Sequence, residues 1–229
     1  MFIMADRNHS GHYIYCQTCG HRGNCIGAQL DQQKLQKLNE LVSRSEPFHI
    51  KDMLFSAGDN FSSLYAIRTG SVKTYTISSD GTKQITGFHF PGSLLGLDAM
   101  VENKHASYAQ ALETAMVCQI PLAKVLAELP EIEENLVSLM SRAINKIHKH
   151  SLAVSQHSAE KRVINFILSL SKVFQQLGLS ASEFLLTMSK VEIGNYNGLS
   201  PETVSRVFSK LQKNHRIELK GKLLKLNRL

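Results

Sequence analysis

The sequence predicts an α+β protein in which an antiparallel β-roll is followed by a long helix and a C-terminal winged helix-turn-helix. Three stretches carry this prediction. Residues 46–121 form short alternating runs separated by glycine turns, which is typical of a small antiparallel barrel or roll. Residues 131–156 contain neither glycine nor proline and repeat apolar residues at helical spacing. Residues 189–212 contain two helix-start signals on either side of Asn197-Gly198, which indicates two short helices and a turn.

The chain of 229 residues is long enough for two modest domains, and its 43% hydrophobic content can supply a core to each. We expect a cysteine-rich segment at 1–28, the β-roll at 29–130, the long helix at 131–156 and the winged helix-turn-helix at 157–229. The N-terminus lacks the basic and apolar regions of a signal peptide, and no apolar run is long enough to span a bilayer. These features predict a cytoplasmic protein without membrane attachment.

Three of the four cysteines, Cys16, Cys19 and Cys25, lie within ten residues in C-Q-T-C-G-H-R-G-N-C. In a cytosolic protein this spacing favours metal binding or redox chemistry over structural disulfides. Together with the remote Cys118, these thiols could bind a tetrahedral zinc ion or a [4Fe–4S] cluster, and the spacing does not choose between the two.

Other interpretations of this segment stay open. His12 or His21 could replace Cys118 in a zinc site, and Cys118 could be a small buried side chain on the strand T-A-M-V-C-Q-I. Gly20 and Gly23 would let the backbone approach a bulky metal group closely. A thioredoxin-like C-x-x-C lies at a helix N-terminus beside a βαβ unit. No such unit follows here, so a dithiol redox enzyme is the weaker alternative.

The β-roll is predicted from three runs, D-M-L-F-S-A-G-D, L-Y-A-I-R-T-G-S-V-K-T-Y-T-I and Q-I-T-G-F-H-F-P-G. Asp80-Gly81 separates the last two runs and predicts a hairpin turn. The regular spacing of short strands and turns indicates a compact antiparallel structure.

The long helix carries a stripe of residues at alternating steps of three and four. This is the heptad seam along which a helix pairs with its own copy. The alternative is a stripe that packs only on the roll. A homodimer is favoured by the sustained heptad, and it suits a helix-turn-helix that reads two half-sites about one DNA turn apart. The predicted interface residues are Val137, Met140, Ile144, Ile147, Ser151 and Val154.

The two short helices have separate start signals. Ser189 stands three residues before Glu192, which is the spacing of a capping box. Ser200 is an N-cap candidate, and Pro201 occupies the first helical position, where its missing N–H costs nothing. Near the start of the second helix, three polar residues share one face: Glu202, Ser205 and Arg206.

The chemistry of that face suits the edges of DNA bases. Arginine can donate twice to guanine, glutamate can accept from cytosine, and serine can contact a base or a phosphate. An ordinary helical hairpin with a solvated charged face is the alternative. However, the sequence I-E-L-K-G-K-L-L-K-L that follows is a hairpin signal and predicts a wing. The predicted DNA-contacting residues are Ser200, Glu202, Thr203, Ser205, Arg206 and, as a phosphate contact, Lys213.

The charge is concentrated at the same end of the chain. Of the net charge of +7, nearly all lies in residues 190–229, which hold nine basic and three acidic side chains. A basic domain beside a nearly neutral one is typical of a protein that binds nucleic acid phosphates. We therefore expect double-stranded DNA as the partner of this domain.

In the order of its elements and in four motifs, the chain resembles the CRP/FNR regulators, and within them the FNR oxygen sensors. The resemblance spans about residues 15–222. Its motifs are L-Y-A-I-R-T-G at 64–70, Q-I-T-G-F-H at 84–89, Q-A-L-E-T-A-M-V-C at 110–118 and I-G-N-Y-N-G-L-S-P-E-T-V-S-R at 193–206.

This resemblance implies a transcription regulator rather than an enzyme, with a β-roll like that of cyclic-nucleotide-binding domains. It implies that Cys16, Cys19, Cys25 and Cys118 hold an oxygen-labile [4Fe–4S] cluster that controls dimerisation and DNA binding. It also implies that Glu202, Ser205 and Arg206 read a TTGAT-like half-site. The RNA polymerase contacts of the family map to Asp80, Gly81, Thr114 and Ser180.

Two departures from the family pattern carry expectations of their own. A cAMP-binding relative has Gly-Glu-Leu and then an arginine for the phosphate, whereas this chain has Gly92-Ser93-Leu94 and His105-Ala106-Ser107. We therefore expect no cyclic nucleotide. FNR proteins tend to have an acidic residue within the seam, where this chain has Ile147. We expect its dimer to depend less on the cluster.

Overall fold

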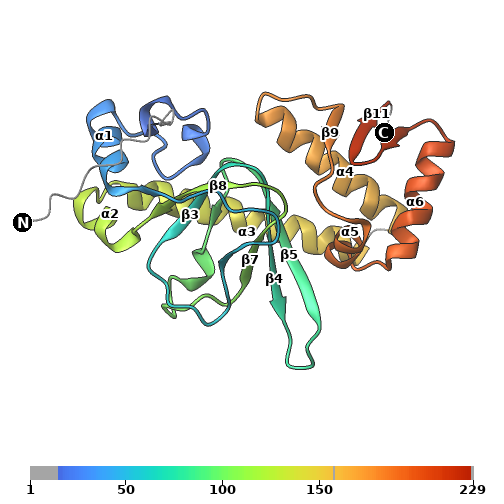
Figure 1. Cartoon of the computed structure of the whole chain (residues 1–229), viewed down its shortest axis with the longest axis horizontal. Coiled ribbons are helices and arrows are strands. Elements are labelled where there is room, and N and C mark those ends of the chain that lie inside the picture. Colours follow the sequence, from blue (N-terminus) through green and yellow to red (C-terminus); the bar gives the residue numbers. More distant parts are fainter. Residues whose placement is uncertain (1–14, 157, 228–229) are drawn as a thin grey trace, which may run out of the picture.

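The computed structural model describes residues 15–156 and 158–227 and confirms the predicted fold class. A cysteine-bearing segment and a β-roll come first, a long helix follows, and a winged helix-turn-helix ends the described chain (Figure 1). Within the described residues, no helix combines the length and the apolar character needed to cross a membrane.

The β-roll consists of two four-stranded antiparallel sheets. Their strand orders are β1-β8-β3-β6 and β2-β7-β4-β5. The two sheets pack through a shared apolar core that includes Phe55, Ile67, Val72 and Val117. The predicted turn at Asp80-Gly81 joins β4 to β5, and Gly81 adopts a φ of +82° there. The strands are β1 (Ser43–Arg44), β2 (Met53–Phe55), β3 (Leu64–Thr69), β4 (Val72–Ile77), β5 (Lys83–His89), β6 (Leu94–Leu95), β7 (Tyr108–Ala111) and β8 (Met116–Ile120).

A second core joins the cysteine segment to three helices beside the roll. The segment contains two short 3-10 turns, η1 (Cys16–Thr18) and η2 (Arg22–Asn24), while a third, η3 (Leu97–Ala99), lies in the roll. The helices are α1 (Gln32–Leu41), α2 (Leu122–Glu128) and the start of α3 (Ile132–Gln156). Ile26, directly after Cys25, is fully buried among Leu35, Leu38 and Ile132. The cysteine segment is therefore anchored in the core at its C-terminal end.

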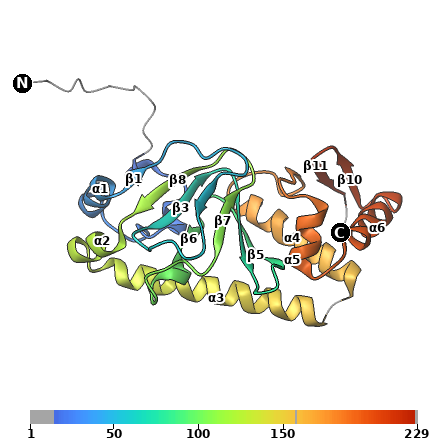
Figure 2. The same ribbon diagram turned by 60° about the horizontal axis from the view of Figure 1, so that its bottom comes forward.

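Helix α3 matches the predicted long helix and runs beneath the β-roll toward the C-terminal domain (Figure 2). Three residues of the predicted seam are large apolar side chains left exposed, at 65% for Val137, 50% for Ile144 and 62% for Ile147. Ser151 is also exposed. Leu152, which is not among the predicted interface residues, is also an exposed apolar side chain, at 55%.

Two other seam residues have contacts within their own chain. Met140 packs on the core of α1 and α2, and Val154 lies beside Gly198 in the C-terminal domain. The apolar stripe of α3 therefore packs partly against its own chain and is partly exposed to solvent.

The C-terminal domain packs three helices on a three-stranded sheet of order β10-β11-β9. The helices are α4 (Ala159–Gln176), α5 (Lys190–Asn197) and α6 (Pro201–Lys213), and the strands are β9 (Glu183–Leu185), β10 (Ile217–Lys220) and β11 (Leu223–Leu226). The capping box of Ser189 and Glu192 is present, Gly198 ends α5 in the left-handed region, and Ser200 caps α6. The predicted helix-turn-helix and wing are confirmed.

Candidate metal centre and nucleic-acid interface

The four cysteines, which are far apart in sequence, line one small pocket. Cys16 begins η1, Cys19 follows it directly, Cys25 follows η2, and Cys118 lies on β8. The backbone N–H of Cys16 donates to Asn39 Oδ1 at 3.1 Å, which ties the start of the segment to α1. The cavity between the cysteines has a volume of about 50 Å³. The fold therefore brings together the set of thiols that the sequence singled out.

Burial favours the protonated form of Cys16, Cys25 and Cys118 by raising their pKa values. It raises the pKa of Cys16 and of Cys25 to about 11, and the other cysteines nearby add to the rise. Backbone groups of Gly27 and Ile26 oppose the rise at Cys25. Burial also raises the pKa of Cys118. Because metal ligation requires the thiolate, binding of a cationic centre here must release protons.

The side chains that line the pocket are not grouped around a single metal ion. Within residues 15–156 and 158–227, no three His, Cys, Asp or Glu side chains are grouped closely enough to hold one metal ion. A tetrahedral zinc ion binds sulfur at about 2.3 Å, so it needs its thiolates close together. His21 lines the pocket, whereas His12 lies outside the described residues.

The sequence predicted a special role for Gly20 and Gly23 beside the metal group, but the structure requires glycine at Gly92 instead. A Cβ on Gly20 or Gly23 would meet no protein atom within 4 Å, so the protein itself does not demand glycine at either position. Gly92, in contrast, lines the pocket with a φ of +86°. A Cβ there would lie 3.3 Å from Asn24 Cβ and 3.7 Å from His21 Cβ, both in the cysteine segment.

Helix α3 holds the backbone just beyond Cys25. Asn135, which is buried in the first turns of α3, donates its side-chain amide to the carbonyl oxygen of Ile26 at 3.3 Å and to that of Ala28. Sequence reasoning missed this residue because a single asparagine on a helix gives no signal of a partner more than a hundred positions away.

Three arginines also line the cysteine pocket, and sequence reasoning assigned none of them a role. They are Arg22, Arg44 and Arg68. Arg68 belongs to the motif L-Y-A-I-R-T-G, which could have pointed to it. Arg44 is placed by strand pairing that the sequence does not reveal, because its strand β1 has only two residues.

Helix α6 lies at the outer end of the C-terminal domain, away from the β-roll (Figures 1 and 2). Val204, Val207 and Phe208 are buried and fix its inner face. Glu202 and Arg206 are exposed, and Ser205 is half-buried beside them. The guanidinium of Arg206 donates to Thr203 Oγ1 at 3.1 Å.

The other predicted contacts border this surface. Ser200 and Lys213 are exposed at the two ends of α6. Ser200 Oγ accepts from the Thr203 N–H at 3.2 Å, and the positive charge of Lys213 complements the negative C-terminal end of the helix dipole.

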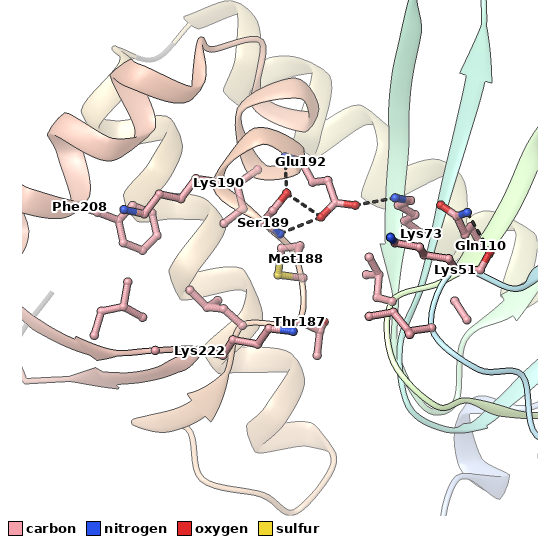
Figure 3. Close-up of a pocket in the computed structure, with 17 residues that line it drawn as sticks. Lys51, Lys73, Gln110, Thr187, Met188, Ser189, Lys190, Glu192, Phe208 and Lys222 are labelled. Carbon is pink, nitrogen blue, oxygen red and sulfur yellow. Dashed lines mark hydrogen bonds and ion pairs between the residues drawn. The ribbon is translucent and has the colours of Figure 1, made fainter.

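Helix α5, the first helix of the helix-turn-helix, is bound to the β-roll by polar contacts. Lys73 Nζ on β4 lies 2.5 Å from Glu192 Oε1 on α5, while the other carboxylate oxygen of Glu192 accepts from Ser189 (Figure 3). The side-chain amide of Asn195 accepts from the Ile85 N–H at 2.6 Å and donates to the Lys83 carbonyl at 2.7 Å. A cavity of about 610 Å³ lies between the two domains next to the Lys73–Glu192 pair. The orientation of α5 is therefore set by the roll.

The candidate polymerase contacts lie at three separate turns. Asp80 and Gly81 form the β4–β5 turn, where Asp80 accepts from Ser78 Oγ and the Thr82 N–H. These hydrogen bonds lower the pKa of Asp80 to about 2, so it is ionised at neutral pH. Thr114 lies between β7 and β8, Ser180 lies between α4 and β9, and both are exposed.

The fold defines a DNA-binding transcription regulator that contains a β-roll, and comparisons with known proteins agree. Residues 46–130 match the cyclic nucleotide-binding domain, and residues 161–229 match the Crp-like helix-turn-helix domain. The chain belongs to the CRP/FNR family, and its curated relatives are of the FNR type.

Two of these relatives and one solved structure illustrate the similarity. The chain is 43% identical to the anaerobic regulatory protein of Haemophilus influenzae over 94% of this chain and 85% of that one. It is 42% identical to the fumarate and nitrate reduction regulatory protein of Escherichia coli (strain K12) over 92% of this chain and 86% of that one. FixK2 from Bradyrhizobium japonicum is 25% identical with a TM-score of 0.73, covering 82% of this chain and 93% of that chain.

Proposed function

We propose that this chain is an oxygen-responsive regulator of anaerobic metabolism, in which an oxygen-labile [4Fe–4S] cluster controls dimerisation and binding to TTGAT-like half-sites. The observation that carries the proposal is the convergence of all four cysteines on one pocket. The proposed ligands are Cys16, Cys19, Cys25 and Cys118.

The donor set fits such a cluster. Four thiols are its usual protein ligands, and raised thiol pKa values mean that the ligands become thiolates only when a cationic centre replaces their protons. When bound, the cluster supplies an oxygen-sensitive group whose loss is the signal. The pocket volume of about 50 Å³ is small, so loading involves an outward movement of the turns that carry Gly20 and Gly23, where space is open.

The DNA-reading role falls to the exposed face of α6. Glu202, Ser205 and Arg206 would contact base edges, and their shared face is free of other elements. Ser200, Thr203 and Lys213 would support them, with Lys213 on a phosphate. Relatives named as fumarate and nitrate reduction regulatory proteins support a regulatory role by similarity.

The exposed stripe of α3 is the proposed dimer interface. An unpartnered row of Val137, Ile144 and Ile147 is costly in water, and pairing with a second copy would bury it. Met140 and Val154 would contribute at the edges, since each already packs within its own chain, and Ser151 would lie between the two helices.

Two further proposals concern partners. Asp80, Gly81, Thr114 and Ser180 would face RNA polymerase, which their exposed positions on turns permit. No cyclic nucleotide is proposed for the roll, because His105 is buried inside it. Its ring stacks on Phe55 with centroids 3.8 Å apart, where a nucleotide-binding relative would present a basic side chain to phosphate.

Anaerobic purification tests the proposed function. We expect straw-brown protein with iron and sulfide in equal amounts, a dimer by sedimentation, and binding to a duplex with two half-sites about one DNA turn apart. Exposure to air should remove colour, sulfide and DNA binding together. A colourless protein that contains zinc, or DNA binding that air leaves unchanged, would contradict the proposal.

A further inference from the structure

Two basic side chains lie on the strands that flank Cys118. In the antiparallel pairing of β1 with β8, Arg44 is directly opposite Cys118, and on the other side Ala66 of β3 is its partner. Arg68 lies two residues beyond Ala66 and lines the same pocket. The remote cysteine thus lies on the strand between the two strands that carry these arginines.

Both guanidinium groups have an unmet hydrogen-bonding capacity. The Nε atoms of Arg44 and Arg68 are buried and have no hydrogen-bond partner among the residues that the structure describes. A buried cation is costly unless an anion or acceptor compensates it. Among the described residues, no aspartate or glutamate lines the pocket, where Arg22 adds a third positive charge. The pocket is therefore built for a negatively charged group.

We propose that Arg44 and Arg68 are the counter-ions of the cluster, holding its net negative charge in place and setting its resistance to oxygen. The inference rests on the proposed function, because the negative charge comes from the four thiolates that ligate the cluster. Neither arginine is a ligand. Each would act through its positive charge and through the donor capacity that is unmet at its Nε atom.

The electrostatics of the pocket support this role. Arg44 is the strand partner of Cys118, and Arg68 lines the same pocket. In a site shielded from water, one charge alters the stability of a nearby anion far more than it would at the surface.

The two arginines differ in their other contacts. Arg44 Nη2 also donates to Asn39 Oδ1, the same oxygen that accepts from the Cys16 N–H. Its loss would therefore disturb the cysteine segment as well as the charge. The Arg68 side chain makes no hydrogen bond within residues 15–156 and 158–227, so it gives the cleaner test.

The experiment compares Arg68→Gln and Arg44→Gln with wild type, using the full chain reconstituted anaerobically. Arg68→Lys restores the charge, and Lys172→Gln removes an exposed positive charge from α4 as a control. The measurements are iron and sulfide per chain, the cluster midpoint potential and the rate of cluster loss in air-saturated buffer. Melting of the iron-free form checks that each variant folds.

We expect Arg68→Gln to lower the midpoint potential, because a positive charge stabilises the reduced and more negative cluster. Cluster loss in air should accelerate roughly tenfold. Arg44→Gln should also lower the midpoint potential and accelerate cluster loss. Arg68→Lys should recover most of the difference, and Lys172→Gln should match wild type.

Three outcomes would overturn the inference. The first is a Gln variant at position 68 with the potential and lifetime of wild type. The second is equal impairment of Arg68→Lys and Arg68→Gln, which would assign Arg68 a packing role. The third is wild-type protein that assembles no iron and sulfide. This last result alone would also refute the proposed function, so the two failures are distinguishable.

Discussion

Lys73 and Glu192 are 119 residues apart in the chain, yet Lys73 Nζ and Glu192 Oε1 are 2.5 Å apart and join the β-roll to helix α5 of the DNA-binding domain. The pair is largely shielded, since the two side chains are 11% and 20% exposed. Glu192 therefore has two tasks, because it also completes the capping box of α5.

Glu192→Gln should lower the free energy of unfolding by about 2 kcal/mol, since it removes a charge-assisted hydrogen bond and leaves Lys73 buried without its partner. Glutamine preserves the capping box. The control is Lys210→Met, which breaks the exposed pair with Glu160 and should cost less than about 1 kcal/mol. Denaturant titration measures both, and equal losses would show that the Lys73–Glu192 pair carries no special weight.

The same pair predicts a pH dependence. Burial opposes ionisation of Glu192, but hydrogen bonds from Lys73 and Ser189 outweigh it and lower the pKa below the usual 4.5. A lowered folded-state pKa contributes stability above pH 4.5 that is lost as the pH falls through the lowered value. The stability difference between wild type and Glu192→Gln should therefore shrink in acid and be constant near neutrality. A stability difference between wild type and Glu192→Gln that does not change with pH would contradict this prediction.

Gly92→Ala should impair cluster loading more than Gly58→Ala. Both glycines have a φ near +90°, so alanine is strained at each by about 1 kcal/mol or more. Only at Gly92 does the new Cβ press on Asn24 and His21 of the cysteine segment, because Gly58 has open space. Anaerobic iron content is the measurement. Equal iron content in the two variants would mean that the segment adjusts freely.

Cys118→Ala should lose the cluster as completely as Cys16→Ala, because three thiolates leave one iron without a protein ligand. Ser107→Ala, a similar change elsewhere in the roll, serves as control. Iron and sulfide are assayed anaerobically. Full cluster content in Cys118→Ala would assign Cys118 to the core instead.

Arg206→Ala should weaken binding to the cognate site by about 1–3 kcal/mol and leave a scrambled duplex nearly unaffected, since it removes a bidentate base contact. Lys213→Ala should weaken both duplexes alike and reduce the salt slope by roughly one. Titrations at several salt concentrations separate the two patterns. If Arg206→Ala reduced affinity equally for both duplexes, Arg206 would be a phosphate contact.

Ile147→Asp should make dimerisation depend steeply on the cluster, because two buried carboxylates would face each other across the seam. Wild-type protein without a cluster should dimerise more readily than this variant. Asn145→Asp places the same charge on nearly the opposite side of α3 and should change little. Sedimentation of both forms decides, and a monomeric cluster-free wild type that Ile147→Asp leaves unchanged would place Ile147 outside the interface.

The sequence was most informative where structure depends on neighbouring residues. The caps at Ser189 and Ser200 and the turn at Gly81 follow from short-range rules, and the structure has each of them. The thiols could be grouped because cysteine is rare and its chemistry is specific. The long helix was recognisable from its period alone.

The contacts that sequence reasoning missed all join distant segments. Arg44 opposite Cys118 depends on how a two-residue strand pairs, and the Lys73–Glu192 pair depends on how two domains pack. The division of the α3 stripe, with Met140 turned to the core and Ile147 to solvent, depends on where the roll covers the helix. Periodicity predicts none of these contacts, because the same helical period describes residues that face the core and residues that face solvent.

The two hydrogen bonds from Asn135 make the Cys25 segment and helix α3 one mechanical unit. If residues 26–28 shifted relative to the helix, a buried amide would lose its acceptors, at a cost of about 1–3 kcal/mol. A displacement of the segment therefore tends to carry the start of α3 with it. Because α3 continues unbroken from there to the exposed Ile144 and Ile147, a rotation at its first turn reaches those side chains with little loss.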